Sequence, residues 1–140
     1  MKKPTVQEAL VHLMVIVSAS DREMTDPELS GIGALARTLP VFAGFPPHRL
    51  LAVAQESQKW LQRENGLAEI LDAVRDTVPA ELHPTAYLIA VEVAVTDLHV
   101  DPAEVRLLHL LRERLELDRA TVEAIEQVVR LRYRTARVHH

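Results

Sequence analysis

A segment that occurs twice constrains the fold of this chain more than any other feature of its sequence. Each copy is an apolar run, then a short acidic stretch, then a second run of residues with helical spacing. The acidic stretches are D-R-E-M-T-D-P-E-L at 21–29 and D-L-H-V-D-P-A-E-V at 97–105. Each begins with an Asp and places a Glu near its end, Asp21 with Glu28 and Asp97 with Glu104. The pattern predicts an internal duplication of a helix–acidic turn–helix hairpin.

Helical spacing of apolar residues extends along the whole chain, and no strand pair with a tight-turn signal occurs. We therefore expect an all-α fold, a single domain over 1–140 with about seven helices. The repeated hairpins would span approximately 6–39 and 84–116. The predicted helices cover 6–20, 26–39, 47–63, 66–78, 84–96, 102–116 and 118–137. A Pro/Gly break at 40–47 carries both phenylalanines of the chain and is expected to pack against the core.

Local capping signals explain part of the repeated motif. Thr25 and Glu28 fit a capping box at the start of a helix, and Glu104 takes the corresponding place in the second copy. Asn65 and Asp118 are expected to cap two further helices. Each Glu of the motif therefore has an explanation in helix energetics that requires no ligand.

The two Asp residues suggest a cation site. Asp21 and Asp97 fall where the preceding helix is expected to end, facing the negative end of its dipole. A bound cation would offset that cost, and hard divalent cations prefer carboxylate and carbonyl oxygens. The candidate metal ligands are therefore Asp21, Glu28, Asp97 and Glu104, with His99 as a further candidate in the second turn. The alternative is that both turns are solvated polar corners.

Composition and motifs exclude several classes of function. The net charge is −4, so the chain as a whole is not suited to binding nucleic acid. The absence of Cys excludes disulfides, thiol catalysis and Cys-ligated zinc. H-E-x-x-H, G-x-S-x-G and Gly-rich phosphate loops are also missing, so we expect neither an enzyme nor an organic cofactor. No signal peptide is recognisable and the apolar runs are too short to span a bilayer, which favours a cytoplasmic protein.

Three polar features outside the turns have structural interpretations. His12 follows Glu8 by one helical turn and is expected to be a paired or half-buried histidine. Glu92 lies in an apolar helix, so it should form a salt bridge with a core-facing Arg. The Arg-rich stretch 130–137 is interpreted as a solvated last helix rather than a site for nucleic acid or an anionic membrane.

The repeated motif resembles that of a known family. S-A-S-D-R-E-M-T-D-P-E-L and V-A-V-T-D-L-H-V-D-P-A-E-V are similar to the two acidic motifs of the TerB-like family, in which D-G-x-φ-x-x-x-E joins two apolar helices. Arg22 and Leu98 stand where the family usually has Gly. L-E-L-D-R-A-T-V-E-A-I resembles the helix start that commonly follows, so the resemblance covers nearly the whole chain.

The resemblance implies an all-helical domain whose acidic clusters are proposed to bind divalent metal, at Asp21 and Glu28 and at Asp97 and Glu104. Ca²⁺, Mg²⁺ or Mn²⁺ would be the ion. The family is linked to stress-response complexes at the inner membrane surface. This implies a non-enzymatic sensor or adaptor with protein partners, and it allows peripheral membrane association and a dimer. The alternative is a metal-free helical interaction module whose acidic turns only cap helices.

Overall fold

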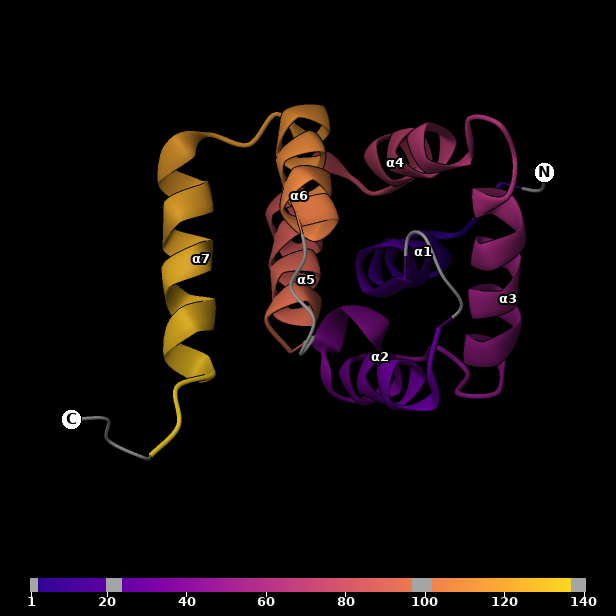
Figure 1. Cartoon of the computed structure of the whole chain (residues 1–140), viewed down its shortest axis with the longest axis horizontal. Coiled ribbons are helices and arrows are strands. Elements are labelled where there is room, and N and C mark those ends of the chain that lie inside the picture. The colour runs from indigo at the N-terminus through magenta and orange to yellow at the C-terminus, as the bar shows by residue number, and fades with distance from the viewer. Residues whose placement is uncertain (1–2, 20–23, 97–101, 137–140) are drawn as a thin grey trace.

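The computed structural model describes residues 3–19, 24–96 and 102–136 (Figure 1). Within these ranges the chain forms seven α-helices, two 3₁₀-helices and no strand, which confirms the all-α prediction. The α-helices are α1 (Val6–Ala19), α2 (Asp26–Thr38), α3 (Arg49–Leu61), α4 (Gly66–Thr77), α5 (His83–Thr96), α6 (Pro102–Leu115) and α7 (Arg119–Arg132), and the 3₁₀-helices are η1 (Pro40–Phe42) and η2 (Ala80–Leu82). The last helix ends at Arg132, short of the predicted end.

Helix α1 lies at the centre of the molecule. Every residue from Ala9 to Ala19 is buried, because the apolar run of this helix covers all of its faces. α3, α4 and α5 pack directly against it, and α2 and α6 make smaller contacts. Figure 1 shows α1 enclosed by α2, α3 and α4. None of the helices in the described ranges is long and apolar enough to cross a membrane.

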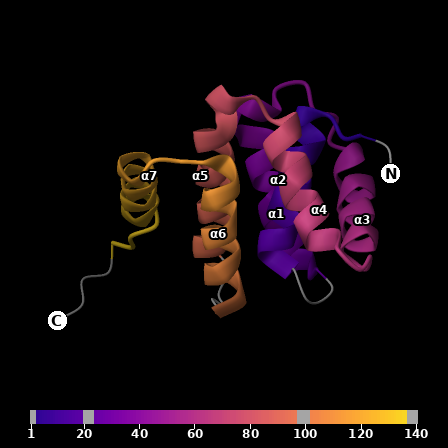
Figure 2. The ribbon, with the colours of Figure 1, turned by 90° about the horizontal axis from the view of Figure 1, so that it is seen from above.

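Helix α5 is also buried, as predicted, and lies between α1 and α7. The helices are arranged in layers, with α7 outermost, α5 and α6 next, and α1–α4 beyond them (Figures 1 and 2). Whether the α1–α2 and α5–α6 hairpins are duplicates of each other stays a prediction.

Two polar contacts fasten α7 to α5. The Tyr87 hydroxyl donates to Glu126 Oε2 at 2.7 Å, and Arg132 Nε lies 2.7 Å from Glu92 Oε1. Because both pairs ascend in the same order along the chain, α5 and α7 run parallel. The salt bridge predicted for Glu92 is confirmed, but its partner is not core-facing. The Arg132 side chain is 56% exposed and reaches Glu92 from the last turn of α7.

The capping predictions are confirmed at two helix starts, whereas at a third the predicted residue, Asn65, holds the N-cap position of α4 without a side-chain bond. Thr25 forms the capping box of α2, and Asp118 Oδ1 accepts a hydrogen bond from Thr121 N at 2.8 Å. Asn65 makes no side-chain capping bond. Its backbone, at φ −114° and ψ 29°, lies outside the extended region that a capping side chain normally requires.

The Pro/Gly break packs against the core, as predicted. Phe42 is buried, and its ring meets Phe45 edge-on at 6.0 Å between centroids. The Gln7 side chain of α1 holds this segment by donating to the carbonyl oxygens of Val41 and Ala43, at 3.2 and 3.0 Å.

The close approach of α3 and α4 predicts a strong effect of a single methyl group. A Cβ on Gly66 would lie 2.1 Å from the carbonyl oxygen of Trp60, so Gly66→Ala would force the two helices apart. We expect it to lower the free energy of unfolding by about 1–3 kcal/mol in urea titrations. Gly31→Ala is the matched control, because a Cβ there meets nothing within 4 Å in the exposed part of α2. It should raise stability by about 0.5–1 kcal/mol. Equal effects of the two changes would contradict this account.

Candidate functional site

At the first acidic turn, the described part of the motif forms a helix cap. Glu28 Oε1 accepts hydrogen bonds from the backbone N–H of Thr25 at 2.9 Å and from its hydroxyl at 3.0 Å. Thr25 Oγ1 in turn accepts from the Glu28 backbone N–H at 3.3 Å. One oxygen of the Glu28 carboxylate is therefore engaged at the start of α2. Asp21 lies outside the described residues.

At the second acidic turn, Glu104 is in a different environment from Glu28. It lies in the first turn of α6, two residues after Pro102, and is only 5% exposed. The helix that carries it, α6, packs against α4 and α5 and also contacts α1. Asp97 and His99 lie outside the described residues. The same position of the repeated motif thus carries a capping carboxylate in one copy and a buried carboxylate in the other.

The described residues alone do not complete a metal site. Over residues 3–19, 24–96 and 102–136, no group of three or more His, Asp or Glu side chains could hold a metal ion. Of the four predicted ligands, the structure describes Glu28 and Glu104, which sit at the starts of α2 and α6. The metal site that would include Asp21 or Asp97 stays a prediction.

The histidine on α1, His12, is buried as part of a pair that the sequence did not identify. His12 is 4% exposed, and its partner is Ser57 of α3 rather than Glu8. The Ser57 hydroxyl donates to the Val53 carbonyl oxygen at 3.1 Å, so its oxygen accepts from the His12 Nδ1–H. The Trp60 ring meets His12 edge-on, with 5.4 Å between ring centroids. Sequence spacing could relate His12 only to its own helix, so the pairing with α3 had no local signal.

His12 opens towards a polar pocket of about 370 Å³ that contains both signs of charge. Glu8 and Arg49 form an ion pair at 2.8 Å on its wall. The backbone N–H of Thr5, and then the Arg49 guanidinium, hold the pKa of Glu8 below its usual value. The remaining charged lining residues are Lys3 and Glu56. Ser57 is fully buried and its proton is committed to a carbonyl, so the Ser–His pair is not arranged as a nucleophile and base.

Burial of His12 predicts a specific dependence of stability on pH. Burial lowers the pKa of His12 to about 4, against a smaller opposing effect of the Glu8 charge. The unfolded chain, with a His pKa near 6.5, then binds the proton first as the pH falls. Stability should be lost between pH 6.5 and 4, by about 3 kcal/mol in total.

The variant His12→Asn keeps a donor for Ser57 without titrating and isolates this effect. The difference in unfolding free energy between wild type and variant should shrink as the pH falls from 6.5 to 4. Loss of the Glu8 interaction falls at lower pH, because the Thr5 backbone N–H and the Arg49 guanidinium hold the pKa of Glu8 below its usual value, and Glu8 is present in both proteins. Parallel stability curves for the two proteins over this interval would contradict the assignment.

A comparison of the sequence with protein-family models shows which family the chain belongs to. The family model described as tellurite resistance protein TerB matches residues 7–127, from α1 into α7 and across both acidic turns. No curated protein and no solved structure matched the chain. The match covers most of the chain, and the all-helical fold agrees with the expectation from its motifs. The chain belongs to the TerB family.

Proposed function

We propose that this chain is a non-enzymatic TerB-family domain that binds a divalent cation, Ca²⁺, Mg²⁺ or Mn²⁺, and acts as a sensor or adaptor in a stress response. Family membership and the position of the acidic motifs support the proposal. The second turn is the principal site, with Asp97 and Glu104 as ligands. The protein would work in the cytoplasm through protein partners.

The burial of Glu104 is the observation that carries this choice of site. A buried carboxylate is costly, and a divalent cation bound through carboxylate oxygens offsets that cost. Glu28 is less suited, because it is only partly buried, so a bound cation would offset a smaller cost there. The first turn would therefore bind a cation more weakly than the second.

The location of Glu104 suggests how a bound cation would be sensed. Glu104 begins α6, and α6 packs on α4 and α5 and contacts the central helix α1. A cation at this point would change the charge at the entry to α6 and favour one packing of that helix. A partner that contacts α6 would then bind the cation-loaded and cation-free forms differently.

A metal-free interaction module is the second candidate. The capping box of Thr25 and Glu28 favours it, because this box accounts for the Glu of the first motif without any ligand. On this alternative, both turns end and start helices, and the function lies in surfaces that contact other proteins.

A calorimetric titration separates the two candidates. Ca²⁺, Mg²⁺, Mn²⁺ and Zn²⁺ are titrated into chelator-stripped protein from which His139 and His140 have been removed, since this pair could bind metal itself. We expect saturable binding that is lost in Asp97→Asn and weakened at least about tenfold in Glu104→Gln.

Glu28→Gln is the matched control, since the amide oxygen keeps the acceptor of the capping box and should leave the affinity within about twofold. Circular dichroism establishes that each variant remains helical. No binding up to millimolar metal would exclude the cation proposal and leave the interaction module. Equal loss of affinity in Glu28→Gln and Glu104→Gln would overturn the preference for the second turn.

A further inference from the structure

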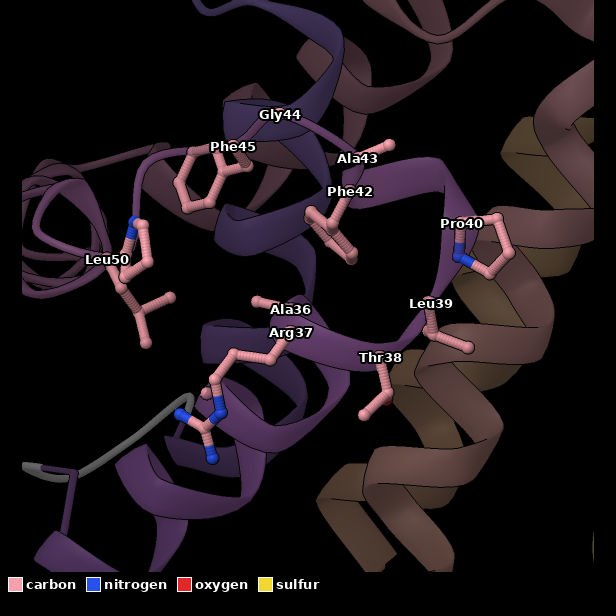
Figure 3. A pocket seen from close by; sticks show the side chains of 12 residues that line it. Ala36, Arg37, Thr38, Leu39, Pro40, Phe42, Ala43, Gly44, Phe45 and Leu50 are labelled. Atoms are coloured by element: carbon pink, nitrogen blue, oxygen red, sulfur yellow. The ribbon is translucent and has the colours of Figure 1, made fainter.

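A second pocket lies between the end of α2, the 40–47 segment and the start of α3. Its volume is about 560 Å³, within the range of small-molecule sites in proteins. Figure 3 shows side chains from these three elements arranged around an open space. The apolar part of the lining includes Ala36, Leu39, Pro40, Phe42, Phe45 and Leu50.

The walls of this pocket are held in place by contacts that need no ligand. Phe42 is buried and meets Phe45 edge-on, and the Gln7 side chain holds the carbonyls on either side of Phe42. Gly44, at φ +80°, makes the turn that brings Phe45 back towards α3, a conformation that other residues rarely adopt. The pocket is therefore preformed rather than shaped by its occupant.

Among the residues that the structure describes, Arg37 is the only charged one in the lining of this pocket. A Cβ built on Gly33 would lie 3.2 Å from Arg37 Nη1 and 3.3 Å from Leu50 Cδ2. The guanidinium thus lies close to the bare backbone of Gly33, next to the Leu50 side chain. Within the described part of the chain, Arg37 forms no ion pair or side-chain hydrogen bond. Within the described residues, the pocket thus combines an apolar wall with one positive charge that has no acidic partner.

We propose that this pocket binds a small amphipathic monocarboxylate. The guanidinium would hold the carboxylate with two parallel hydrogen bonds, and the apolar body would lie against Phe42, Phe45 and Leu50. The single positive charge selects an anion over a neutral or cationic ligand, and the apolar lining selects against small hydrophilic anions. None of the described lining residues belongs to the acidic motifs at 21–29 and 97–105, so the two proposals are tested on different residues.

Octanoate is the probe for this site, with 1-octanol as the matched ligand that lacks the charge. Binding to the full chain is followed by NMR shifts of the Phe42, Phe45 and Leu50 side chains. We expect saturable binding of octanoate with a Kd below about 1 mM, and binding of 1-octanol at least about tenfold weaker.

Substitutions separate the contribution of the Arg37 charge from that of the apolar lining. Arg37→Gln should weaken octanoate at least about tenfold and leave 1-octanol unchanged. Arg130→Gln removes another exposed arginine, on α7, and should leave the affinity of both ligands unchanged. Phe45→Ala should weaken both ligands, since it removes apolar wall.

Three results would overturn the proposal. One is the absence of saturable shifts at the lining residues. Another is equal weakening by Arg37→Gln and Arg130→Gln, which would indicate attraction by overall charge. The third is 1-octanol binding as tight as octanoate binding, with octanoate affinity unchanged by Arg37→Gln. That result would indicate an apolar surface that accepts the side chain of a protein partner. Asp97→Asn, the test of the cation proposal, should not change octanoate affinity.

Discussion

The complete burial of α1 determines where the other helices lie. A helix that is apolar on every face cannot lie at a surface, so it must be covered on all sides. In this chain α3, α4 and α5 supply most of that cover, and α2 and α6 complete it. Glu28 and Glu104 lie in the first turns of α2 and α6, which follow the buried helices α1 and α5 in the chain and are themselves more exposed. The candidate ligands that the structure describes therefore belong to the helices that cover the core rather than to the core itself.

Local sequence signals predicted the helices well, because each depends on neighbours in the chain. The caps at Thr25 and Asp118 involve residues three positions apart, and a capping pattern records such contacts directly. The failure at Asn65 has a tertiary cause, since α4 begins where Gly66 must pass against the Trp60 carbonyl. The contact between α3 and α4 determines the backbone conformation of Asn65, which therefore differs from the extended conformation that a capping Asn prefers.

Contacts between distant segments could not be predicted from the sequence. The pairing of His12 with Ser57 and of Glu92 with Arg132 depends on which helices become neighbours. The same is true of the candidate site. The motif identified Glu28 and Glu104 as equivalent, whereas packing buries only Glu104 and leaves Glu28 in a cap. The 560 Å³ pocket likewise arises where α2, α3 and the 40–47 segment meet.

The parallel contact of α7 with α5 has a consequence for how the molecule opens. If only the last turn of α7 frayed, Arg132 would leave while the rest of the helix still covered Glu92, and a buried carboxylate would lose its counter-charge. If the whole helix separated, water would hydrate that carboxylate. Fraying of the last turn of α7 alone is therefore less favourable than fraying of an ordinary helix end. α7 should detach in a single cooperative step, as one unit of local unfolding, and its amides should exchange with solvent at a common rate.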